Sequence, residues 1–186
     1  MASLLALSDP RFLTAEEFYQ IDFGPDLKAE LDNGVIRMMA GGSRDHARVQ
    51  GNLMIALGTR LRGSGCRPYG SDMSVRAHEL SVRYPDVTVD CGGPSDTGQD
   101  TRLSAPRVIF EVLSPSTRET DLRVKREEYR LLPTVDTIVF VDPDAETSCV
   151  HQRTDAGWTE TLFARHDVDL VSLGLIIPHA EIFARD

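Results

Sequence analysis

The stretch RVIFEVLSPST, residues 107–117, places a carboxylate in the middle of a segment that should be a buried strand. Residues 106–114 are rich in β-branched and aromatic residues and have the length of a central strand. Because side chains alternate along a strand, Glu111 shares a face with Ile109 and Leu113. A buried, unpaired carboxylate is costly, so Glu111 must be protonated, paired with a cation or bound to a metal. A structural ion pair with an arginine and a functional site both meet that requirement.

The chain is typical of a single α/β (α+β) domain over residues 1–186, with one mixed β-sheet flanked by helices. With 186 residues, it is long enough to bury a core of its own. Apolar periodicity and turn residues predict the order of the elements. Helices are expected at 13–18, 43–63, 116–133 and 178–186, and strands at 28–40 (an N-terminal hairpin), 66–77, 83–93, 106–114, 136–143, 148–153, 158–163 and 168–175, the last three as an antiparallel end to the sheet.

The N-terminal hairpin is predicted to turn at Asn33-Gly34. That register places Glu30 opposite Arg37. Glu30 is therefore open to two interpretations. It is either one half of a cross-strand ion pair, worth roughly 0.2–1 kcal/mol, or an acidic member of a site.

The cysteine content and the net charge limit the classes of protein to which the chain can belong. Cys66, Cys91 and Cys149 are scattered and form no CxxC pair, so we expect neither a zinc site nor a disulfide framework. This usage fits a reducing, cytoplasmic setting. No apolar run reaches the roughly 18 residues of a membrane span, and residues 1–10 do not read as a signal peptide. The net charge of −9 counts against a general nucleic-acid binder but is compatible with an enzyme that handles DNA through one local basic groove.

Two more charged residues stand out beside Glu111. Asp86 follows Pro85 at the start of the strand VTVD. It is either part of a turn, as Pro-Asp often is, or a carboxylate that faces a cleft. Lys125 lies on the inward stripe of its helix, either as a lysine with a buried stem and a hydrated head or as a cation of a site. Two carboxylates from neighbouring strands make an oxygen site suited to Mg²⁺. A lysine at its edge supplies charge that can orient a water and stabilise a phosphate.

Three segments of the sequence carry a resemblance to known proteins. YPDVTVD, IFEVLSPSTRETDLRVKREEY and TIVFVDPDAE, in this order, resemble the PD-(D/E)xK nuclease superfamily and, more narrowly, the bacterial Uma-type endonucleases. The likeness extends to LTAEEFYQI, AELDNGVIRMMAGG and the His46 that follows, and so covers residues 13–150. It implies a restriction-endonuclease-like fold and a homodimer. It also implies a Mg²⁺-dependent endonuclease, with Mn²⁺ as a substitute ion, that hydrolyses DNA phosphodiester bonds and leaves a 5′-phosphate.

The resemblance also assigns roles to residues of this chain. It implies that Asp86 and Glu111 bind the metal, with the backbone carbonyl of Val112 completing the site. Lys125 would orient the attacking water or steady the developing charge. The sequence departs from the superfamily pattern two residues after Glu111, where Leu113 replaces the usual lysine. In the Uma-type variant that lysine comes from the following helix, and Lys125 matches it.

Four further residues are candidates around that set. Glu30 matches an early catalytic glutamate of the variant. His46 is either an accessory group or a satisfied, partly buried histidine. Tyr129 is expected to pack with its hydroxyl near the site. Asp121 precedes Lys125 by four residues and is expected to pair with it, which would keep the lysine protonated.

Two other functions compete with the nuclease. A catalytically inactive restriction-like fold would act as a protein-interaction module, which the net charge of −9 favours and the intact charged set disfavours. A Ser–Lys hydrolase would use Ser114 or Ser116 with Lys125, but the chain lacks a GxSxG pattern. DNA contact would have to come from local positive charge, and the sequence has two arginine clusters: Arg60, Arg62 and Arg67, and Arg118, Arg123, Arg126 and Arg130. Each cluster is either a DNA contact or, as charge runs usually are, a solvated face. The polar segment 92–105 is a candidate lid.

Overall fold

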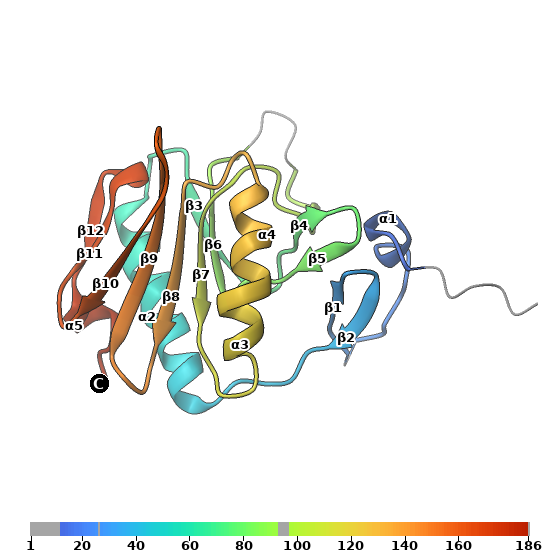
Figure 1. The fold of residues 1–186 in the computed structure, drawn as a ribbon, viewed down its shortest axis with the longest axis horizontal. Coiled ribbons are helices and arrows are strands. Elements are labelled where there is room, and N and C mark those ends of the chain that lie inside the picture. The colour runs from blue at the N-terminus through green and yellow to red at the C-terminus, as the bar shows by residue number, and fades with distance from the viewer. Residues whose placement is uncertain (1–11, 26, 93–96, 186) are drawn as a thin grey trace, which may run out of the picture.

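The computed structural model describes residues 12–25, 27–92 and 97–185, so the expectation for residues 1–10 and part of the expected lid lie outside the described residues. The central sheet has six strands: β3 (Arg67–Gly70), β6 (Val87–Asp90), β7 (Pro106–Val112), β8 (Thr137–Asp142), β9 (Thr147–Thr154) and β10 (Gly157–Ala164). Their order is β10-β9-β8-β7-β6-β3 (Figure 1). Only β7 and β8 are parallel neighbours in this sheet; the other pairs are antiparallel.

Helices cover both faces of the central sheet (Figure 1). One face carries α2 (Arg44–Arg60), and the other carries α3 (Arg118–Thr120), a π-helical turn (Asp121–Lys125) and α4 (Arg126–Leu131). Phe110 of β7 packs in the same core as Leu53 of α2, whereas Ile109 packs with Tyr129 of α4. Because side chains alternate along a strand, Glu111 belongs to the face that α4 covers.

A second sheet and a short helix flank the central sheet. Its order is β2-β1-β5-β4, from β1 (Ala29–Asp32), β2 (Val35–Met38), β4 (Val75–His78) and β5 (Ser81–Arg83), with α1 (Ala15–Phe18) beside it. The predicted hairpin register is confirmed, since Glu30 pairs with Arg37. Asn33 and Gly34 at its turn have φ values of 47° and 82°, the left-handed conformation that this two-residue turn requires. Thr14 and Glu17 form a capping box at the start of α1.

The C-terminal segment departs from the predicted single sheet. β11 (Val168–Leu170) and β12 (Leu175–Ile177) pair with each other in a separate two-stranded sheet, joined by a 3₁₀ turn (Val171–Leu173) and followed by α5 (His179–Ile182). The expectation that 168–175 extends the central sheet is therefore wrong. The apolar side chains of β11 and β12 instead cover the core beneath α2. The α+β class itself is confirmed.

The expectation of no disulfide is also wrong, because Cys66 and Cys91 are joined, with their Cα atoms 3.9 Å apart. Cys66 precedes β3 and Cys91 follows β6, and these strands pair Arg67 with Asp90. The register therefore places the two cysteines opposite each other, which their spacing in the sequence does not reveal. Cys149 is a free thiol. Among the helices described here, none is long and apolar enough to span a membrane.

Candidate active site

A cleft of about 300 Å³ opens where β6 begins and β7 ends. Asp86, Glu111, Val112, Asp121 and Lys125 all line it. The structure thus brings together the residues of both motifs and the lysine of the following helix.

Asp86 is positioned by the pairing of β6 with β7. These antiparallel strands have a register that places Asp86 opposite Glu111. The backbone N–H of Val112 donates to Oδ2 of Asp86 at 2.7 Å, and Nε2 of His46 lies 3.2 Å from the same oxygen. The hydrogen bond to Asp86 raises the pKa of His46 above its ordinary value. Gln50, one turn further along α2, donates to the backbone carbonyl of Asp86 at 2.8 Å.

Glu111 is buried, and its carboxylate has partners from the helical face. Tyr129 donates its hydroxyl to Oε1 of Glu111 at 2.6 Å, and Nζ of Lys125 donates to the same oxygen at 3.2 Å. Burial raises the pKa of Glu111 to about 8 despite the opposing charge of Lys125. Burial and the Glu111 carboxylate also raise the pKa of Tyr129 well above its usual value, so the phenol remains a donor. Neither partner is the arginine that a simple structural ion pair would use.

Lys125 is surrounded by carboxylates. Its Nζ lies 3.2 Å from Glu111, 3.2 Å from Asp121 and 3.4 Å from Glu30. Burial alone would lower the pKa of Lys125, but these carboxylates reverse the effect and raise it above its ordinary value. Lys125 therefore remains an ammonium at neutral pH. The predicted pairing with Asp121 is confirmed, and both residues lie in a π-helical turn, a feature often found at functional sites, where a regular helix was expected.

Glu30 reaches this cluster from the second sheet. Its carboxylate lies 3.4 Å from Arg83 as well as 3.4 Å from Lys125, and it lines a neighbouring cavity of about 540 Å³. Arg37, which faces Glu30 across the hairpin, has its ion pair with Asp32 at 3.6 Å instead. The contacts of Glu30 are therefore those of a member of the cluster.

Sequence reasoning missed Arg83, which connects the second sheet to α4. Its side chain is 1% exposed. It contacts Glu128 at 2.6 Å and Asp32 at 2.7 Å, in addition to Glu30. The signal was available, since a basic residue directly follows Ser81-Val82 in a buried strand. Arg83 fixes the position of Glu30 and thereby the edge of the cluster.

The arginines expected to contact DNA are mostly ion-paired. Arg60 pairs with Glu181, Arg118 with Asp142, Arg123 with Glu119, and Arg126 and Arg130 with Glu127. These pairs offset part of the positive charge of both predicted clusters.

The sequence of the chain is similar to those of a known family. Residues 15–182 match the family model described as Uma2, putative restriction endonuclease. Two uncharacterized proteins of Synechocystis sp. are similar: one is 29% identical over 166 residues (88% of this chain and 87% of the relative), and the other is 30% identical over 141 residues (75% and 80%).

A solved structure shows the same fold. The crystal structure of a putative nuclease belonging to DUF820 from Anabaena variabilis matches with a TM-score of 0.74 at 16% sequence identity, covering 92% of this chain and 98% of that chain. The predicted restriction-endonuclease-like fold and the resemblance noted from the sequence are thereby confirmed.

Proposed function

The chain belongs to the Uma2 family of putative restriction endonucleases, and on that premise we propose that it is a metal-dependent endonuclease that hydrolyses DNA phosphodiester bonds. The charge balance of the cleft carries the proposal. The carboxylates of Glu30, Glu111 and Asp121 lie within 3.4 Å of the Lys125 ammonium, and a fourth carboxylate, that of Asp86, lines the same cleft. A divalent cation would balance the excess negative charge.

The donor atoms suit Mg²⁺, which prefers oxygen ligands and one or two carboxylates. Asp86, Glu111 and the backbone carbonyl of Val112 would hold the ion, with Mn²⁺ as a substitute. The hydrogen bonds to Asp86 end on Oδ2 and those to Glu111 end on Oε1, so the other oxygen of each carboxylate would be the one to hold an ion. When bound, Mg²⁺ polarises a phosphoryl oxygen and lowers the pKa of a water molecule.

The chain's own residues supply the other requirements of hydrolysis. Lys125, held as an ammonium, orients the attacking water or stabilises the charge that develops on the phosphate. Gly41, Gly42 and Ser43 line the cleft at the start of α2, where free backbone N–H groups favour an anion such as the scissile phosphate. Water adds its oxygen to phosphorus, the bond to the 3′ oxygen breaks and that oxygen takes a proton, which leaves a 5′-phosphate.

The Ser–Lys hydrolase is disfavoured by the same contacts. A lysine base needs a depressed pKa, whereas the carboxylates around Lys125 raise its pKa. The hydroxyl of Ser114 lies within hydrogen-bond distance of Ser116 and Thr117, at 3.1 and 2.9 Å. The interaction module remains the second candidate, since the net charge of −9 and the paired arginines favour it over a DNA-binding surface.

The proposal extends to the assembly and setting of the enzyme. Restriction-like folds often pair up to cut two strands, so a homodimer is part of the proposal. We also propose a cytoplasmic setting, because cellular DNA is found there, although the Cys66–Cys91 disulfide is typical of an oxidising compartment.

Plasmid cleavage tests the proposal directly. The purified chain is incubated with supercoiled DNA and Mg²⁺ or Mn²⁺, with and without a chelator. We expect nicking that chelation abolishes and that Asp86→Asn or Glu111→Gln reduces at least a hundredfold. Asp169→Asn, which removes an exposed carboxylate on β11, is the matched control and should cleave normally. Cleavage that survives chelation, or no cleavage by the wild type with either ion, contradicts the proposal; the second result favours the interaction module.

A further inference from the structure

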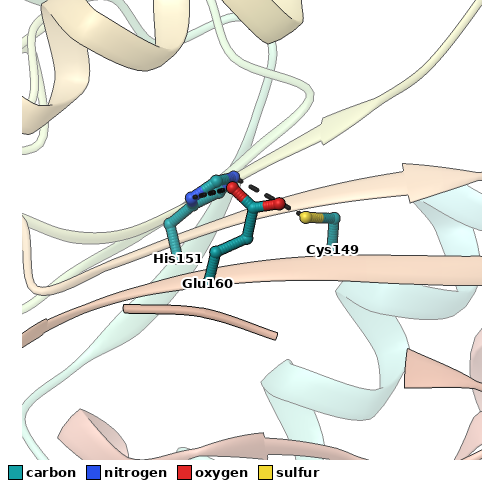
Figure 2. Close-up of side chains that lie close together, drawn as sticks. All are labelled: Cys149, His151 and Glu160. Carbon is teal, nitrogen blue, oxygen red and sulfur yellow. Dashed lines mark hydrogen bonds and ion pairs between the residues drawn. The ribbon is translucent and has the colours of Figure 1, made fainter. Parts of the chain in front are cut away.

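A second cluster of metal-ligating side chains lies on the β9–β10 hairpin. Cys149 and His151 are two residues apart on β9 and therefore share a face, and Glu160 of β10 is the strand partner of His151. One ligand atom from each residue lies within 4.8 Å of the others. Figure 2 shows the three side chains pointing toward one another. None of them is among the residues that line the cleft.

The distance between Cys149 and His151 is close to that of two ligands in a tetrahedral zinc site. Sγ of Cys149 lies 3.7 Å from Nε2 of His151. Zinc–sulfur and zinc–nitrogen bonds of about 2.3 and 2.0 Å at a tetrahedral angle place the two ligand atoms roughly 3.5 Å apart. The carboxylate of Glu160 lies 3.6 Å from the other ring nitrogen of His151 and is 59% exposed, so it is free to turn toward an ion.

We propose that Cys149, His151 and Glu160 bind a divalent transition metal of the zinc class at a site separate from the proposed nuclease centre. A thiolate and a carboxylate together balance the charge of the ion, and the imidazole is a neutral ligand. Sulfur and nitrogen donors select Zn²⁺ over Mg²⁺, whereas the oxygen donors of the cleft favour Mg²⁺. The sequence did not reveal this site because Glu160 joins the two β9 residues only through strand pairing.

Packing around the cluster fixes the central ligand. The imidazole of His151 is 1% exposed and lies edge-on to Phe140, with ring centroids 5.6 Å apart. Bound metal would link β9 to β10 at the edge of the central sheet. The exposed side of the cluster leaves the fourth position to water.

Arg130 is the group that opposes metal binding. Its Nη2 lies 3.1 Å from Nδ1 of His151. A metal on Nε2 requires a proton on Nδ1, so that nitrogen can no longer accept a hydrogen bond from Arg130. Arg130 has two other contacts that it can keep when a metal is bound: it lies 3.1 Å from Glu127 and 5.6 Å from the ring of Trp158.

Cobalt(II) titration of the full chain, without added thiols, tests the proposal, because a thiolate ligand gives Co²⁺ an intense near-ultraviolet charge-transfer band that oxygen ligands do not. We expect this band to saturate at one equivalent, to be lost in Cys149→Ser and to disappear when Zn²⁺ is added. Cys66 and Cys91 remain in that variant, so a persisting band would assign the signal to them and overturn the proposal, as would no band in the wild type. Asp86→Asn and Glu111→Gln should keep the band, which separates this site from the nuclease proposal.

Two surface variants keep the test decisive if Cys149→Ser fails to fold. Glu160→Gln should weaken Co²⁺ binding at least tenfold. Arg130→Met should tighten it severalfold, because the competing donor and its charge are removed. Unchanged affinity in Glu160→Gln, or equal or weaker affinity in Arg130→Met, would overturn the proposed ligand geometry.

Discussion

Replacement of Lys125 by methionine tests whether one buried ammonium holds the carboxylate cluster together. Methionine keeps a long apolar side chain but removes the charge. The variant would lack the ammonium group, which lies 3.2–3.4 Å from the carboxylates of Glu30, Glu111 and Asp121, so these carboxylates would face one another without a cation. The expected result is a large loss of stability together with loss of DNA cleavage.

The magnitude follows from the distances. At about 3.3 Å and an effective dielectric constant of about 20, each ion pair contributes an attraction of roughly 5 kcal/mol, from which the cost of desolvating the charges must be subtracted. Removing one partner of a buried ion pair typically costs about 3–5 kcal/mol. In a domain of this size 1 kcal/mol corresponds to about 2–4 °C in Tm, so we expect Tm to fall by roughly 6–20 °C.

Urea unfolding without divalent ions measures the loss, and Lys28→Met is the matched control. Lys28 pairs with Asp72 at 3.2 Å on the surface, where an ion pair is worth about 1 kcal/mol or less. Combining Lys125→Met with Glu111→Gln should cost less than the sum of the two single changes, because the double variant has fewer unpaired charges. Additive losses, or a loss in Lys125→Met no larger than in Lys28→Met, would refute the reasoning.

Three further predictions concern residues around the site and in the hairpin. In Gly42→Ala the new Cβ would lie 2.8 Å from Nδ1 of His46, so the imidazole must shift away from Asp86. Plasmid cleavage should fall about tenfold, equivalent to about 1.4 kcal/mol. NMR titration should show a lower pKa for His46, because its hydrogen bond to Asp86 is weakened. Burial would raise the pKa of Asp142, but hydrogen bonds from backbone N–H groups and Arg118 outweigh it and hold this pKa below its ordinary value. Asp142→Asn should therefore cost about 1 kcal/mol at neutral pH, and the difference from wild type should vanish in acid unfolding as the pH falls through the folded-state pKa. Gly34→Ala forces a left-handed φ of 82° on alanine and places its Cβ against Phe12, so it should cost at least about 1–2 kcal/mol in urea unfolding, whereas a cost below 0.5 kcal/mol would contradict the turn conformation.

The sequence was sufficient to predict the strands of the site and the meeting of their acidic residues. Glu111 breaks an apolar strand and Asp86 begins the strand before it, and antiparallel pairing of these neighbours places the two residues opposite each other. The pairing of Asp121 with Lys125 followed from their four-residue spacing. Each of these predictions depends on local spacing or on strands that are adjacent in the chain.

Features that depend on long-range packing were not predicted. The contact of Arg83 with Glu128 joins residues 45 positions apart, on different elements. The Cys66–Cys91 disulfide depends on the register of β3 with β6. The π-helical turn has no recognisable sequence signal, because its residues are ordinary helix residues. Periodicity indicates which side of an element is buried, but it does not indicate which distant element covers that side.

The position of the lysine explains why this chain departs from the superfamily pattern. Leu113, where a strand lysine would stand, lines the cleft but packs in the apolar cluster with Tyr129 beneath α4, and a lysine there would lose this packing. Lys125 instead reaches Glu111 from the helix above that cluster, at 3.2 Å. The same packing brings the hydroxyl of Tyr129 to the carboxylate. The apolar residue at 113 and the lysine at 125 are therefore parts of one arrangement, because Leu113 helps to hold the helix that carries the lysine against the strand.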